Sequence, residues 1–170
     1  MAGERFLQPD LVNGRVDAVV AVQAGGAGSE NKIPALDSAG RLALTMMPVG
    51  VGAAVKDVVT SEALAAGDIV NLHVSTGLKA RKADATTEKE GVGFVLSAYD
   101  SAATATVYFE GIITGLTGLT AGSRYFLAKT AGAVTTDVSA YAAGNILQYL
   151  GIAISTTELK FEPGEPITLG

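Results

Sequence analysis

The chain has 170 residues, enough for one hydrophobic core or for one domain with an appended arm, but short for two full domains. Its formal net charge is −5 and it has no long run of Lys or Arg, so we expect no direct nucleic-acid partner, because phosphate binding needs clustered cations. The sequence contains no Cys, which excludes disulfides and thiolate metal sites.

Small side chains dominate the apolar part of the sequence. Apolar residues make up 48% of the chain, but only 6% of residues are aromatic, so we expect a shallow core that gains stability from oligomerisation. No stretch approaches the roughly 20 uninterrupted apolar residues of a membrane span. The first residues, MAGERFLQPD, lack the layout of a secretory signal. We therefore expect a protein made in the cytoplasm, with no export signal and no membrane partner.

Residues 1–52 contain short apolar clusters between turn-forming sequences such as VNGR, AGGAGSEN and DSAG. In residues 31–52, NKIPALDSAGRLALTMMPVGVG, prolines and glycines interrupt any long helix or strand. We predict an extended N-terminal arm over residues 1–52 whose apolar side chains contact another chain; the alternative is a linker that folds back on its own domain. The predicted contact residues are Ile33, Pro34, Leu36, Leu42, Leu44, Met46, Met47 and Pro48.

From Ala53 onward, β-branched and aromatic runs recur between Gly, Asp, Ser and Thr, at the spacing of roughly 8 to 12 residues that is typical of an all-β sandwich or barrel. We predict an all-β domain over residues 53–170, either a small β-barrel or a β-sandwich. The predicted strands are residues 54–59, 68–73, 78–82, 91–96, 104–110, 112–114, 124–127, 146–154 and 167–169.

Alternation is clearest in TATVYFEG, where Ala105, Val107 and Phe109 are expected on one face of a strand and the residues between them on the other. Two other segments are ambiguous. TSEALAAGD is either a loop, which we favour, or a short helical turn capped by Ser61. TTDVSAYAAGN leaves room for one turn of helix.

The sequence carries no recognisable catalytic motif. GGAGSENK and GVGAAVK lack the Gly-Lys-Ser/Thr ending of a phosphate loop. His73 is the single histidine, and we interpret it as structural or surface-exposed, since no partner for a zinc site or a proton relay is indicated. Asp84, Glu88 and Glu90 could supply oxygens to Ca²⁺, but the EF-hand spacing is missing and a solvated hairpin tip is favoured. We predict a non-enzymatic protein without cofactor or metal.

Longer phrases carry a family resemblance. GLTGLTAGSRYFLAKTAGAVTT and GNILQYLGIAISTTELKFEPGEPITLG resemble a pattern of tailed-bacteriophage structural proteins: GL-x-AG-x-x-YFL, a G-x-V/I-T hairpin, and a Q-x-x-G-x-A-x-S-x-T-x-L strand. ALAAGDIVNLHVSTGLKARKADAT is similar to the first half of the same modules. IPALDSAGRLALTMMPVG resembles the linkers that precede fibre and decoration domains.

The resemblance implies a small β-barrel or β-sandwich module on the virion surface. We expect a head decoration (cement) protein that binds the major capsid protein and stabilises the shell, because the long heptads and repeats of a fibre shaft are missing. A closed homo-oligomer fits this role, with a trimer favoured and a dimer as the alternative. The alternatives are a tail or head fibre or adaptor protein and, from another class, a carbohydrate-binding module.

Overall fold

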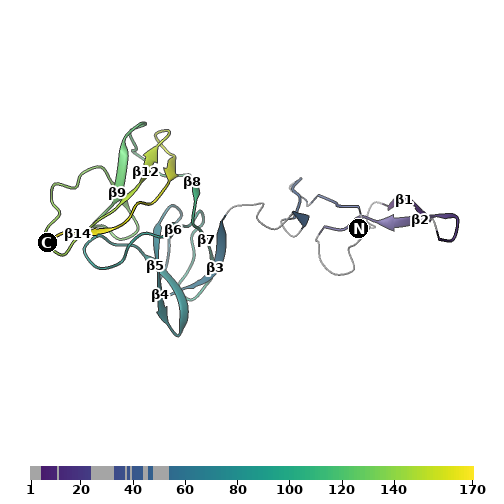
Figure 1. Ribbon diagram of the computed structural model, residues 1–170, viewed down its shortest axis with the longest axis horizontal. Helices are drawn as coiled ribbons and strands as arrows, with labels where there is room; N and C mark the ends of the chain where they lie inside the picture. Colours follow the sequence, from purple (N-terminus) through teal and green to yellow (C-terminus); the bar gives the residue numbers. More distant parts are fainter. Residues whose placement is uncertain are drawn as a thin grey trace. The chain divides into compact units, whose positions relative to one another are not determined.

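The computed structural model describes residues 5–10, 12–23, 33–36, 38, 40–43, 46–47 and 54–170. The chain divides into two units, Met1–Gly52 and Ala53–Gly170 (Figure 1). All regular secondary structure of the described residues consists of β-strands, and none of these residues lies in an α-helix. The predicted all-β fold class is therefore confirmed.

The N-terminal unit contains an antiparallel hairpin, which the sequence did not predict. Strand β1 (Arg5–Asp10) pairs with β2 (Arg15–Val20), and Asp10 lies opposite Arg15. Gly14 closes the turn with a φ of 64°, a conformation that favours glycine. Pro9 lies within β1, which is possible because a two-stranded sheet consists of edge strands, where proline is tolerated.

Five strands of the C-terminal unit form a closed barrel, which decides between the two predicted architectures. The pairing of β3 with β5 is parallel, and the other pairings are antiparallel. In order around the barrel the strands are β3 (Val55–Thr60), β5 (Gly77–Lys82), β4 (Ile69–Ser75), β6 (Gly93–Phe94) and β7 (Thr104–Tyr108).

A second, open sheet has five short antiparallel strands, and a separate two-stranded sheet joins β11 (Ile146–Leu147) to β14 (Ile167–Thr168). The predicted strand 146–154 is thus divided into β11 and β12, which belong to different sheets. The open sheet runs in the order β10 (Val134–Thr135), β9 (Arg124–Leu127), β12 (Tyr149–Ala153), β13 (Leu159–Phe161) and β8 (Gly111–Ile113).

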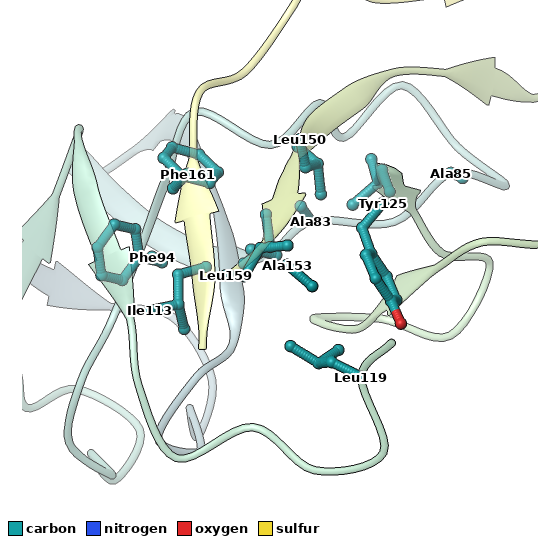
Figure 2. Close-up of a cluster of buried hydrophobic side chains, with 12 residues drawn as sticks. Ala83, Ala85, Phe94, Ile113, Leu119, Tyr125, Leu150, Ala153, Leu159 and Phe161 are labelled. Carbon is teal, nitrogen blue, oxygen red and sulfur yellow. The ribbon is translucent and has the colours of Figure 1, made fainter. Parts of the chain in front are cut away.

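Two hydrophobic cores hold these sheets. The first is built mainly of Val and Ala side chains such as Val58, Ala80 and Val107, as the composition predicts, together with Leu64. The second is larger and includes Phe94 and Phe161, whose rings meet edge to face with centroids 5.2 Å apart. Figure 2 shows the second core, with Leu159 and Phe161 of β13 lying between Phe94 and Tyr125. Side chains of both the barrel strands and the open sheet contribute to it, which joins the two layers.

Strand β7 confirms the predicted alternation. Ala105 and Val107 are fully buried in the first core, and Phe109 packs partly buried against it. Tyr108 points to the other side, where it packs against the second core and stacks on Phe94 at 5.4 Å. The strand therefore has apolar contacts on both faces.

Both ambiguous segments lack helix. The segment after Ser61 is a loop in which Leu64 forms an antiparallel bridge with Tyr99, and the Asp68 carboxylate accepts the Ala65 N–H at 2.7 Å. In the segment 135–145, hydrogen-bonded turns such as Tyr141 N–H to Val138 C=O replace the helical turn that the sequence left open.

The buried polar side chains of the described residues are all hydrogen-bonded. Gln148, 3% exposed, accepts the Gly91 N–H at 2.7 Å and donates to the carbonyls of Gly91 and Gly164 at 3.0 and 3.1 Å. Gln148 lies between β11 and β12 in the chain, so one side chain ties three distant segments together.

Candidate interaction surfaces

The predicted contact residues of the N-terminal unit are mostly exposed to solvent. The exposed fractions of Ile33, Leu36, Leu42 and Met47 lie between 36% and 56%. Pro34 is also exposed, whereas Met46 is half-buried. Leu44 and Pro48 lie outside the described residues. The described members of this set therefore present apolar surface that this unit does not bury.

Backbone hydrogen bonds hold part of this segment beside residue 22. The Val22 N–H donates to the Ile33 carbonyl at 3.0 Å, and the Ala35 N–H donates to the Val22 carbonyl at 2.7 Å. The Gln23 amide donates to the Leu36 carbonyl at 3.0 Å. Residues 33–36 therefore form an extended segment, as expected, but one that is tied to the chain following the hairpin.

A groove of about 680 Å³ lies at one edge of the open sheet, and the sequence did not predict it. Ile112 of β8 and Ile154 line it and are 46% and 47% exposed. Glu110, Lys160 and Glu162 border it, and Lys160 pairs with Glu162 at 3.1 Å. Because that ion pair is exposed, its contribution to stability is small. The remaining lining residues are Phe109, Gly111, Phe161 and Pro163.

Strand β8 is the edge of the open sheet beside this groove. Two hydrogen bonds show which backbone groups beside β13 point toward β12. The Ile154 N–H donates to the Glu158 carbonyl, and the Glu162 N–H donates to the Leu150 carbonyl. By alternation, Leu159 and Phe161 direct their backbone groups toward β8, opposite Ile113 and Gly111. The N–H and C=O of Ile112 then point away from the sheet. An outward backbone pair next to exposed apolar side chains suits contact with another chain.

His73 lies on β4, and its Nε2 is 2.9 Å from the Ser61 hydroxyl. That hydroxyl also donates to the Ala80 carbonyl at 3.3 Å. When the hydroxyl donates to Ala80, the Nε2–H of His73 donates to the Ser61 oxygen; the tautomer of the ring decides between this arrangement and donation from Ser61 to His73. Partial burial lowers the pKa of His73, the Arg81 guanidinium lowers it further, and Glu62 opposes the shift.

The carboxylates considered for Ca²⁺ lie at a hairpin tip, in agreement with the favoured interpretation. Asp84 bridges to Lys89, and its carboxylate accepts the Thr86 N–H and hydroxyl at 2.8 and 2.7 Å. Glu88 and Glu90 are exposed. Within the described ranges, no group of three or more His, Asp or Glu side chains gathers in a way that could hold a metal ion.

Comparison with known proteins leaves the chain without an assigned relative. No protein-family model, curated protein or solved structure matches it. Among the described residues, no helix has the length and apolar character needed to cross a membrane.

The groove was missed because its residues come from distant segments. Glu110 and Ile112 are about fifty residues from Lys160 and Glu162 in the sequence, and each occurs in an ordinary strand pattern. The sequence shows only apolar residues at alternate positions of a strand. The same pattern occurs in strands that pack on a hydrophobic core, so it does not identify a groove.

Proposed function

We propose that this protein is a non-enzymatic structural protein of a tailed-bacteriophage virion, and that it decorates the outer surface of the capsid. The observation that supports this proposal best is the exposure of Ile33, Leu36, Leu42 and Met47 in the N-terminal unit, alongside a separate and well-packed β unit. Such a chain offers apolar surface for another protein while the β unit retains its own cores.

The physical role follows from repetition. Each bound copy adds buried area across the junction of two capsid subunits, and that area must be lost before the shell opens. A modest interface is sufficient, because many copies act on one shell. An extended apolar segment suits a surface groove of the major capsid protein, since backbone hydrogen bonds and small apolar contacts supply the affinity.

The proposal is tested by adding the purified full chain to capsids that lack it, followed by cosedimentation and a difference map from electron microscopy. We expect density on the outer capsid surface, at positions of local threefold symmetry. Density on the tail would instead support the fibre or adaptor alternative, and a failure to bind capsids would contradict the proposal.

A second experiment separates the role of the N-terminal unit from that of the β unit. Deletion of residues 1–50 is expected to abolish capsid binding. Undiminished binding by the truncated chain would show that the β unit carries the capsid contact. Binding on a glycan array would support the carbohydrate-binding alternative.

A further inference from the structure

The hairpin formed by β4 and β5 ends in an exposed apolar pair. Val74 and Leu78 lie opposite each other across the hairpin, and they are 79% and 43% exposed. Gly77 turns the chain between them with a φ of 90°. In Figure 1 the hairpin projects from the bottom of the barrel. Burial of a projecting apolar tip against another surface is favourable, because it removes apolar area from water.

The same hairpin is cationic in an acidic chain. Residues 69–82, IVNLHVSTGLKARK, contain Lys79, Arg81 and Lys82 and no Asp or Glu, whereas the whole chain has a net charge of −5. Lys82 is paired with Asp68 at 3.0 Å, and the Arg81 Nε donates to Asn71 at 2.8 Å. Lys79 directly follows Leu78, so a positive charge accompanies the apolar tip.

The groove beside β8 has the complementary character. Its exposed apolar side chains include Ile112 and Ile154. The charged groups on its border are the carboxylates of Glu110 and Glu162 and the ammonium group of Lys160, so its border is negative overall. The hairpin tip and the groove therefore match in both polarity and charge.

One copy cannot make this contact with itself. The tip of β4 and β5 and the strands β8 and β12 lie at opposite ends of the C-terminal unit in Figure 1. We propose that the groove of one copy receives the β4–β5 hairpin tip of a second copy. The contact is heterologous, because it joins two different surfaces, and repetition around a rotation axis closes a ring. This inference does not depend on capsid binding.

The test is sedimentation velocity of the full chain and three single variants without capsids. Leu78→Asp places a charge on the hairpin tip, and Ile154→Asp places one in the groove. Ile167→Asp is the matched control, since Ile167 is 59% exposed and belongs to neither surface. We expect the wild type and the control to sediment as assemblies, and the hairpin and groove variants as single chains of 17.2 kDa.

Mixing the two defective variants gives the decisive result. One retains an intact groove and the other an intact hairpin, so an equimolar mixture should form a two-chain species that neither variant forms alone. A mixture that remains monomeric, a monomeric wild type, or assemblies unchanged by both variants would overturn the proposal.

Charge reversal provides an independent pair of variants if an apolar-to-Asp variant fails to fold. Lys79→Glu and Glu110→Lys lie on exposed or half-buried positions of the two surfaces. Each is expected to weaken assembly about tenfold, and more at low salt than at high salt. Assembly that is insensitive to both reversals would contradict the charge complementarity.

Discussion

Gly151 of β12 lies against the backbone of Lys160 on β13, so closely that a β-carbon on Gly151 would be 2.0 Å from the Lys160 carbonyl oxygen. The pairing of β12 with β9 shifts register between Tyr149 and Gly151, at the same point. The sheet that carries the groove therefore depends on a glycine at this position.

We predict that Gly151→Ala destabilises the protein by roughly 3 kcal/mol, because a methyl group cannot fit without separating two backbones. Chemical denaturation measures this loss. Gly164→Ala is the matched control: its β-carbon would make an ordinary 3.6 Å contact with Tyr149, and we expect little change. Equal stability of both variants would contradict the close approach.

Replacement of Gln148 tests the polar tie between distant segments. Gln148→Leu keeps the size of the side chain but leaves the buried N–H and C=O of Gly91 without this partner. We expect a loss of about 3 kcal/mol in the free energy of unfolding. Gln23→Leu, at an exposed glutamine that donates to the Leu36 carbonyl, should change stability by less than about 0.5 kcal/mol. A Gln148→Leu protein as stable as the wild type would refute this role.

The titration of His73 should make the free energy of unfolding depend on pH. Its pKa is lowered in the folded protein, mainly by burial and then by Arg81, so the folded state binds the proton less well than the unfolded chain does. The contribution of the neutral imidazole to the free energy of unfolding is therefore fully present above the ordinary pKa of 6.5. It decreases as the pH falls from 6.5 toward the lowered pKa of the folded state.

Comparison of the wild type with His73→Gln isolates this effect from the titration of carboxylates. The difference in unfolding free energy should shift against the wild type as the pH falls from about 7.5 to about 5. As the chain has one histidine, a single imidazole NMR titration should give a midpoint below 6.5. A midpoint at or above 6.5 would contradict the prediction.

Leu36→Ser combined with Leu42→Ser tests the apolar surface of the N-terminal unit. Both side chains are exposed, so we expect the melting temperature of the β unit to be unchanged. Affinity for undecorated capsids should fall at least about tenfold, because the substitutions remove apolar area that the proposed contact buries. Ile167→Ser is the control in the β unit. Capsid affinity equal to that of the wild type would remove these leucines from the contact.

The sequence was informative where structure depends on local patterns. Strand β9 has the predicted bounds, Arg124–Leu127, and the alternation of Ala105 and Val107 identified buried positions correctly. Strand β13 was missed because Leu159–Phe161 is too short to show a periodic pattern. Strand β1 was missed because Pro9 is a strand breaker in most sheets, although an edge strand accepts it.

The sequence by itself determined the all-β class, most strand positions and the turns, because side-chain alternation and turn-forming residues act over a few neighbours. Only the tertiary structure decided that β3 pairs in parallel with β5 and that β8 is an edge. It also decided that Ile112 and Ile154 share a groove. Strand pairing uses backbone hydrogen bonds that nearly all residues offer alike, so the partners of a strand emerge only when distant segments pack around common cores.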